Sequence, residues 1–113
     1  MRRAEKHNQG KTRYSLLSVP AIKQMADVMT IGAAKYGDRN WEIGRNFTDY
    51  YDAAQRHMQA WLNREDGDSE SGINPLAHAA CNLMFLLHFQ SDPDRYGSFD
   101  DRPKPCAGQK KKQ

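Results

Sequence analysis

Apolar residues recur at helical spacing in two segments of the chain, and a third segment is apolar on nearly every side. In the ranges 20–35 and 47–63 the apolar positions repeat every three or four residues, which is the period of an amphipathic helix. Between Leu76 and Leu87 only His78 and Asn82 are strongly polar. No strand-like alternation of useful length is present. The pattern predicts an all-α fold: a small bundle of about three main helices.

Residues at the ends of these segments support the helix assignment. Ser18 is expected to cap the first helix and Gly37 to stop it. Asn46 with Asp49 resembles a capping box at the start of the second helix. Asn74 is expected to cap the third helix, which runs to about residue 89.

The third helix needs more cover than two short amphipathic helices provide, because it is apolar nearly all round. We therefore expect a homo-oligomer, a dimer or tetramer, in which third helices or their flanks pack across a symmetric interface. Oligomerisation would complete the small bundle.

Charge and polarity divide the chain into a basic arm at 1–9, a helical domain at 10–90 and a polar tail at 91–113, which we expect to be flexible. The net charge of +3 comes from Lys and Arg clusters near the two ends. No nucleic-acid recognition motif accompanies these clusters, so we do not expect a nucleic-acid partner.

No run of eighteen apolar residues and no signal peptide are evident, so we expect no membrane association and a cytoplasmic location, which is the host cytoplasm if a phage encodes the protein. Cys81 and Cys106 lack metal-ligand spacing and are expected to stay reduced.

The range 63–72 is the most acidic stretch, with four carboxylates and no apolar residue. Carboxylate oxygens suit Mg²⁺ or Mn²⁺ and leave positions open for substrate phosphates. The alternative is a solvated loop between helices. The four acidic residues are Glu65, Asp66, Asp68 and Glu70.

His78 and Asn82 are four residues apart and share one face of the third helix, where buried polar groups need partners. Either His78 faces a site at the acidic loop, or it is a core histidine whose hydrogen bonds are satisfied.

Cationic and aromatic residues outside the helix interiors could hold a nucleotide. Cations bind polyphosphate, aromatic rings stack on a base, and an amide can read its edge. For Trp41 the alternative is a plug over the bundle, and for Arg56 a surface salt bridge to Asp52. His57 could orient a carboxylate or a water. The candidate substrate contacts are Lys11, Arg13, Lys35, Tyr36, Asn40, Trp41, Arg56, His57 and Asn82.

Four motifs together resemble a known family. They are GKTR at 10–13, IGAAKYGDRNW at 31–41, DAAQRHMQAW at 52–61, and EDGDSESG followed by LAHAACN within 65–82. Over about seventy residues they resemble the N-terminal domains of phage-associated dATP/dGTP diphosphohydrolases, which are grouped with the all-α MazG-like pyrophosphohydrolases.

The resemblance implies an oligomeric, metal-dependent enzyme that splits a purine deoxynucleoside triphosphate into monophosphate and pyrophosphate. By chemical type, Glu65, Asp68 and Glu70 are assigned as metal carboxylates, and Glu65, Asp68 and His78 as the catalytic side chains. Lys11, Arg13, Lys35 and Arg56 would contact phosphate, and Asn40 and Trp41 the nucleoside.

Two positions depart from the family pattern: Pro75 stands where members commonly have a histidine, and Arg64 where they have a glycine. An alternative follows from the missing histidine. The protein could bind and sequester a nucleotide without hydrolysing it, as a phage factor against host defence would.

Overall fold

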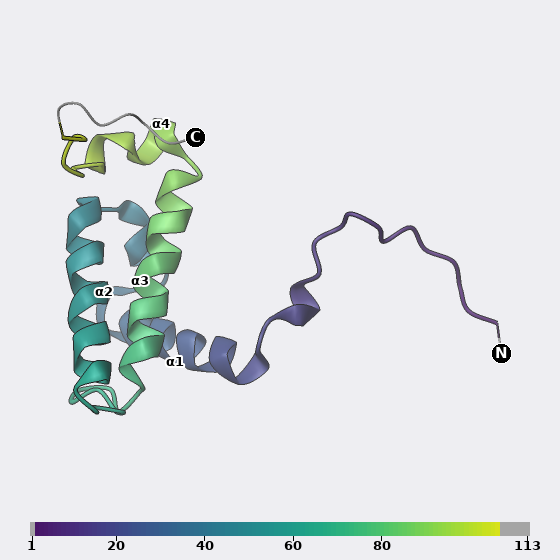
Figure 1. The fold of residues 1–113 in the computed structure, drawn as a ribbon, viewed down its shortest axis with the longest axis horizontal. Helices are drawn as coiled ribbons and strands as arrows, with labels where there is room; N and C mark the ends of the chain where they lie inside the picture. Colours follow the sequence, from purple (N-terminus) through teal and green to yellow (C-terminus); the bar gives the residue numbers. More distant parts are fainter. Residues whose placement is uncertain (1, 107–113) are drawn as a thin grey trace.

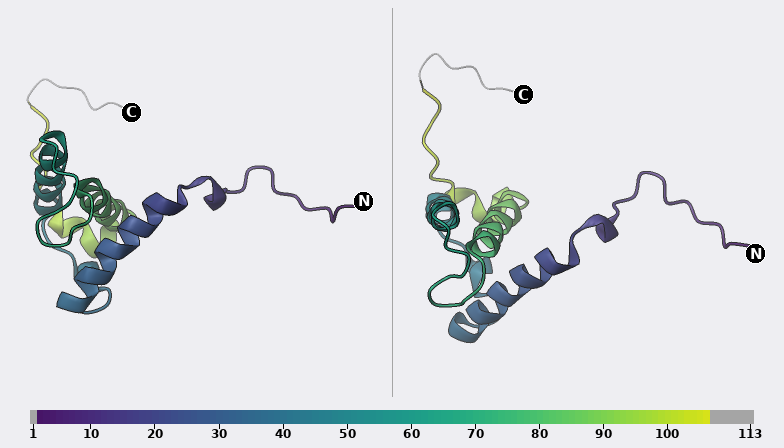
Figure 2. Two further views of the ribbon diagram at one scale, coloured as in Figure 1. Left: turned by 90° about the horizontal axis from the view of Figure 1, so that it is seen from below. Right: turned by 60° about the horizontal axis from the view of Figure 1, so that its bottom comes forward.

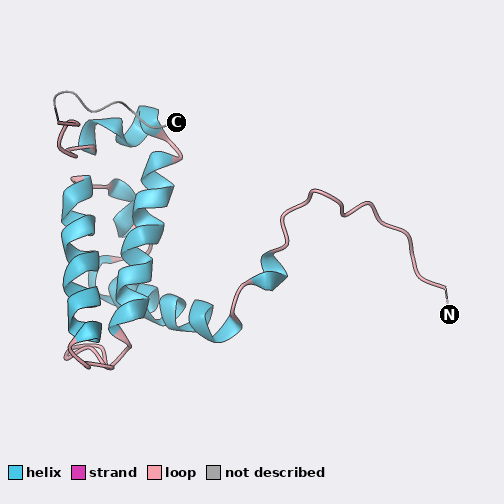
Figure 3. Ribbon diagram, in the orientation of Figure 1, coloured by secondary structure: helices cyan, strands magenta, loops and turns pink. Residues whose placement is uncertain are grey.

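The computed structural model describes residues 2–106 and contains helices and loops but no strand in that range (Figures 1 and 3). The main helices are α1 (Val19–Tyr36), α2 (Phe47–Leu62) and α3 (Pro75–Gln90), followed by the short α4 (Pro93–Tyr96). Three 3₁₀ turns, η1 (Tyr14–Leu16), η2 (Asn40–Ile43) and η3 (Gly97–Phe99), lie between or beyond them. The all-α prediction is confirmed, and each main helix begins and ends within one residue of its expected bounds.

α2 and α3 lie side by side and antiparallel (Figure 1). Aromatic rings fill one end of their contact. Phe89 is completely buried, and its ring stacks on Phe47 with centroids 5.9 Å apart. Tyr50 packs between Phe85 and Phe89. This cluster is the hydrophobic core, and it holds α3 in register against α2.

α1 packs on α3 from about Met25 onward, and its exposed first residues, 19–24, project beyond the body (Figure 2). The Cys81 thiol donates a hydrogen bond of 3.4 Å to the carbonyl of Met25 in α1. The radius of gyration is 18.1 Å, whereas a compact chain of this length has about 13 Å. Part of the excess comes from residues 2–13, which extend away from the helices (Figure 1).

Residues 92–101 form part of the fold, in contrast to the expectation of a flexible tail from residue 91. Tyr96 is only 1% exposed, and its ring packs on Phe89 at 4.7 Å. Its hydroxyl donates to the carbonyl of Glu42. The polar composition of this stretch concealed Tyr96, which completes the core, and Phe99, which packs against it. The remainder of the expected tail, residues 107–113, lies outside the described residues.

The helix caps are partly as predicted. Ser18 accepts a hydrogen bond from the N–H of Ala21 at 3.2 Å, and Asn74 caps α3 through the N–H of Leu76 at 2.8 Å. The predicted capping box at Asn46 is wrong, because its side chain makes no capping bond. A carboxylate from the C-terminal segment caps α2 instead.

Two further findings concern the whole described chain. Both cysteine thiols are free, with Cys81 buried and Cys106 exposed. Within residues 2–106, no helix combines the length and the apolar content that a membrane crossing requires.

Candidate functional site

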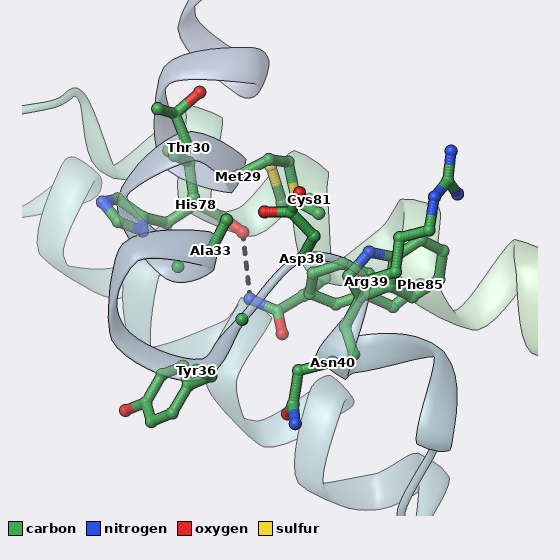
Figure 4. Close-up of a pocket in the computed structure, with 15 residues that line it drawn as sticks. Met29, Thr30, Ala33, Tyr36, Asp38, Arg39, Asn40, His78, Cys81 and Phe85 are labelled. Atoms are coloured by element: carbon green, nitrogen blue, oxygen red, sulfur yellow. Dashed lines mark hydrogen bonds between the residues drawn. The ribbon is translucent and has the colours of Figure 1, made fainter.

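A cavity of about 620 Å³ opens between the second half of α1, the turn at 37–41 and one side of α3 (Figure 4). Five of the residues predicted from the sequence line it: Tyr36, Asn40, Trp41, His78 and Asn82. The ten other lining residues include Met29, Ala33, Asp38, Arg39, Cys81 and Phe85. One concavity therefore brings together aromatic, amide and charged groups from segments about forty residues apart.

The turn between α1 and η2 shapes the mouth of this cavity. Gly37 ends α1 with φ of +95°, and Arg39 has the left-handed φ of +58°. A glycine tolerates such a φ at no steric cost, whereas an arginine does so only when its surroundings hold it. The Arg39 guanidinium donates to the Glu42 carboxylate at 3.1 Å, across the start of η2. The resulting bend places Asp38, Arg39 and Asn40 together at the cavity.

Trp41 both lines the cavity and packs against the aromatic core. Its ring stacks on Phe85 with centroids 4.9 Å apart and meets the edge of His88 at 4.8 Å. It also packs against the buried Phe89. Both alternatives for Trp41 are therefore compatible with its position, because the indole belongs to the core and also lines the cavity.

His78 is held from two sides at the other end of the cavity. Its Nε2 shares a hydrogen bond of 2.8 Å with the hydroxyl of Ser71, and its ring stacks on His57 at 4.7 Å. Burial and the neighbouring His78 lower the pKa of His57. The acidic loop thus folds back to His78, although Ser71 makes the contact. Asn82 donates its amide to the carbonyl of His78 at 2.9 Å (Figure 4).

The carboxylates predicted to bind metal, Glu65, Asp68 and Glu70, do not point toward a common position within the chain. Asp68 turns its Oδ2 inward to accept the backbone N–H groups of Glu70 and Ser71, each at 3.0 Å, and these bonds lower its pKa. The Glu70 carboxylate is 80% exposed and lies 3.4 Å from the Lys35 ammonium. Glu65 is exposed. In the described part of the chain, no three His, Cys, Asp or Glu side chains are grouped so that they could hold a metal ion.

A second, more polar cavity of about 320 Å³ lies along α2 and contains Arg56 together with Arg45, Asp49 and Asp52. Among residues 2–106 no ion pair joins Arg56 to Asp52, so the surface salt bridge that was the alternative for Arg56 does not form. Asn82 lines both cavities. It is therefore the point at which they adjoin.

Lys11 and Arg13 lie apart from the other predicted site residues. Both are exposed in the segment that precedes α1, which extends away from the body (Figure 1). Lys35 is nearer, at the end of α1, but its ammonium faces Glu70 and it does not line the cavity.

Sequence analysis missed Asp38, Arg39 and Cys81 as cavity residues. Asp38 and Arg39 belong to the quoted motif at 31–41, so their place between Tyr36 and Trp41 was an available signal. The sequence around Cys81 did not indicate a cavity residue, because an apolar neighbourhood fits a core cysteine as well as a cysteine at a cavity. Burial raises the pKa of its thiol to about 11, so the thiol is neutral at physiological pH.

Comparison with known proteins matches the family model "dATP/dGTP diphosphohydrolase, N-terminal" to residues 1–102. The chain belongs to this family. A dATP/dGTP diphosphohydrolase of Salmonella phage PMBT28 is 38% identical over 82 residues, which cover 73% of this chain. The chain spans 28% of the length of that relative. No solved structure shows significant similarity to the chain. The cavity-lining motif at 31–41 lies inside the family match.

Proposed function

We propose that the cavity binds a purine nucleoside triphosphate of the dATP/dGTP type, and that the protein hydrolyses it to the monophosphate and pyrophosphate. The observation that carries this proposal is the gathering of an aromatic wall, two side-chain amides and a guanidinium around one cavity, inside the family match. The name of the phage relative supplies the reaction type and the substrates. Such a reaction would draw on the nucleotide pool of the cytoplasm, the location expected from the sequence.

Different parts of the cavity lining suit different parts of a nucleotide. The apolar side chains of Met29, Ala33 and Phe85 offer a slot for a base, and the Asn40 amide can both donate to and accept from its edge. The Arg39 guanidinium can hold phosphate oxygens. His78, held by Ser71, lies on the cavity wall with its ring position fixed. No group on this wall is required as a covalent nucleophile, because water can attack phosphorus.

The requirement for Mg²⁺ or Mn²⁺ stays a prediction. Asp68 uses one carboxylate oxygen on backbone amides and Glu70 faces Lys35, so the acidic residues of one chain do not form a ligand set. Mg²⁺ is usually held by one or two carboxylates together with substrate phosphates and several waters, so phosphates and water would supply the remaining ligands here.

Product analysis tests the proposal. The protein is incubated with each common nucleoside triphosphate and deoxynucleoside triphosphate with Mg²⁺ or Mn²⁺, and the products are separated by chromatography. Release of pyrophosphate and monophosphate from purine substrates is the expected result. Stepwise loss of single phosphates would overturn the reaction type.

A cavity-filling variant connects the activity to this site. A Cβ on Gly32 would meet no atom within 4 Å, so Gly32→Leu places its side chain in open space of the cavity. This variant is expected to lose nucleotide binding while keeping its helical content. Ala34→Leu is the matched control, because Ala34 is exposed on the same helix and does not line the cavity. Equal binding by both variants would place the site elsewhere.

A second candidate function is sequestration of the nucleotide without hydrolysis. It is favoured by the acidic side chains, which do not converge in the described residues, and by Pro75 at the position where the family resemblance leads us to expect a histidine. The double variant Glu65→Ala, Asp68→Ala separates the two functions. In the enzyme it abolishes the product release that the wild type shows, whereas in a sequestering protein it leaves nucleotide binding intact and no product forms with or without the carboxylates.

A further inference from the structure

Glu42, in η2 next to Trp41, is held by groups from α3 and from the C-terminal segment. Its backbone carbonyl accepts hydrogen bonds from the Tyr96 hydroxyl and from the Arg95 guanidinium, the latter at 3.3 Å. Its carboxylate Oε1 lies 3.9 Å from Nε2 of His88, in the last turn of α3. The Glu42 side chain is only 22% exposed. Elements distant in sequence therefore hold this carboxylate in place.

The other oxygen of the same carboxylate holds Arg39. Oε2 of Glu42 accepts a hydrogen bond of 3.1 Å from the Arg39 guanidinium, and the Arg39 side chain is 78% exposed. In the part of the chain that the structure describes, this is the one hydrogen bond that the Arg39 side chain makes. A long exposed side chain loses conformational entropy when a ligand orders it, and a bond that exists beforehand lowers that cost. Glu42 thus orients the Arg39 guanidinium before a ligand arrives.

The backbone of Arg39 is also held in an uncommon conformation. Its φ of +58° and ψ of +18° lie in the left-handed region, which residues with a side chain adopt only when their surroundings hold them there. Such backbone conformations gather at sites that bind ligands. The backbone and the bond to Glu42 both point to the Arg39 side chain as the group that this turn serves to place.

The bond to Glu42 leaves most of the guanidinium available. A guanidinium has several N–H donors in one plane, and Glu42 accepts from the one nitrogen Nη1. The remaining donors can form a fork toward two oxygens of a phosphate. Arg39 stands at the edge of the group of cavity side chains, with its guanidinium on the outer side (Figure 4). It can therefore meet phosphates at the mouth of the cavity while Glu42 still holds it.

Charge alone would give Glu42 the opposite effect. A carboxylate close to a phosphate repels it, so removal of the carboxylate would strengthen binding if repulsion dominated. Here the carboxylate is paired with the exposed Arg39 guanidinium, where water and salt screen the repulsion. Orientation and repulsion thus predict changes of opposite sign when the charge of Glu42 is removed.

We propose that Glu42 is a positioning residue for the nucleotide: its carboxylate holds the Arg39 guanidinium in the orientation that binds the phosphates. Glu42 does not line the cavity, and it acts only through Arg39. The C-terminal segment supports this role through the hydrogen bonds of Arg95 and Tyr96 to the Glu42 carbonyl. The inference rests on the proposed function, because it assigns Arg39 to the phosphates of the ligand.

The first test measures the affinity of the full chain for α,β-methylene-dATP, in which carbon replaces the oxygen between the first two phosphates. This analogue cannot be cleaved at that position, so calorimetric titration gives its Kd without turnover. Glu42→Gln replaces the carboxylate by an amide of the same shape. We expect it to weaken binding about 5-fold, within the range for coupled residue pairs. Unchanged or tighter binding would overturn the proposal.

A double-mutant cycle separates positioning from a merely structural role. If Glu42 acts through Arg39, Glu42→Gln should not weaken binding further in a chain that already carries Arg39→Gln. If Glu42 only maintained the turn, its replacement would weaken binding by the same factor in both backgrounds. Equal factors would therefore contradict the proposal, and they would do so even where Glu42→Gln lowers the stability of the fold.

Asp27→Asn is the matched control for charge. It also replaces one carboxylate of an ion pair by an amide, since Asp27 pairs with Lys23 on α1 at 2.9 Å and does not line the cavity. It should change the Kd by less than about 2-fold, because an exposed ion pair away from the site contributes little. Equal weakening by Asp27→Asn and Glu42→Gln would attribute the effect to net charge and remove the role of Glu42.

The same titrations distinguish failure of this inference from failure of the proposed function. If the wild type does not bind the analogue, the cavity is not a nucleotide site and both are wrong. If the wild type binds it and the two substitutions are additive, only the role of Glu42 is wrong. The expected result is binding by the wild type, weakening by Glu42→Gln, and no further weakening once Arg39 has been replaced.

Discussion

The carboxylate of Asp101 binds the backbone N–H of Thr48 at 2.9 Å and its hydroxyl at 2.6 Å, across 53 positions of sequence. Thr48 is in the first turn of α2, where backbone N–H groups have no partner within the helix. A side chain at the start of a helix normally supplies this cap. Here a residue after the last helical turn supplies it, and so fastens the C-terminal segment to α2.

We expect Thr48→Ala and Asp101→Ala each to lower the melting temperature, and the double variant to lower it by less than the sum. The Thr48 hydroxyl and the Asp101 carboxylate share one hydrogen bond, so the double variant loses that bond only once, whereas the bond from the Thr48 backbone N–H is lost only with Asp101. Circular dichroism melts of the four proteins measure this coupling. Strict additivity would mean that the contact contributes nothing in solution.

Tyr96→Ala should lower the free energy of unfolding by about 3–5 kcal/mol, because it removes a buried aromatic ring from the core. Tyr96→Phe should cost about 1 kcal/mol through the lost hydrogen bond to Glu42. Urea titration gives both values. Tyr36→Ala, at an exposed tyrosine, is the control and should change the value by less than about 0.5 kcal/mol. A small effect of Tyr96→Ala would show that residues 92–101 do not pack in solution.

Stability should decline as the pH falls below 6.5, in part because of His57. Burial and the neighbouring His78 lower the pKa of His57 in the folded protein below its ordinary value of 6.5. The unfolded chain then takes up the proton more readily, so stability present above pH 6.5 is lost as the pH falls through 6.5 toward the folded pKa. Melting temperatures at about pH 7.5 and about pH 5.5 should differ less in His57→Gln than in the wild type. An equal difference would remove His57 as a cause.

Arg39→Gln should weaken nucleoside triphosphate binding about 10-fold, the loss expected for one charged hydrogen bond. Calorimetric titration measures the affinity. Arg102→Gln is the matched control, since Arg102 is also paired with a neighbouring carboxylate, that of Asp100, and does not line the cavity. If both variants lost affinity equally, the effect would reflect net charge, and Arg39 would have no special contact.

The helices could be predicted because their signals are local. The caps of α1 and α3 lie within three residues of the N–H groups that they accept from. The cap of α2 could not be predicted, since nothing near Asn46 indicates that Asp101 will occupy its place. Tyr96 was missed for a related reason. Tyr96 and Phe99 are two isolated aromatic residues in a polar stretch and show no helical period, so only the tertiary contact with Phe89 reveals where Tyr96 packs.

The candidate site was predicted in part for the same reason. An aromatic residue and an amide in a loop signalled Asn40 and Trp41, and both line the cavity. Four carboxylates close together in sequence predicted a metal site. Adjacent residues in a turn, however, point in different directions. The Asp68 carboxylate accepts hydrogen bonds from backbone amides of its own loop instead of facing the other acidic side chains. Whether acidic side chains converge is decided by the path of the loop, which their spacing does not report.

The two thiols differ in their surroundings, so one of them can be labelled selectively. Cys81 is buried with a pKa of about 11, whereas Cys106 is exposed. Alkylating reagents act on the thiolate, so a maleimide dye will label Cys106 and leave Cys81 intact. A single fluorophore could thus be attached close to the contact between Asp101 and Thr48 with no change of sequence. The dye would report loss of the contact between Asp101 and Thr48, while Cys81 in the cavity wall stays unmodified.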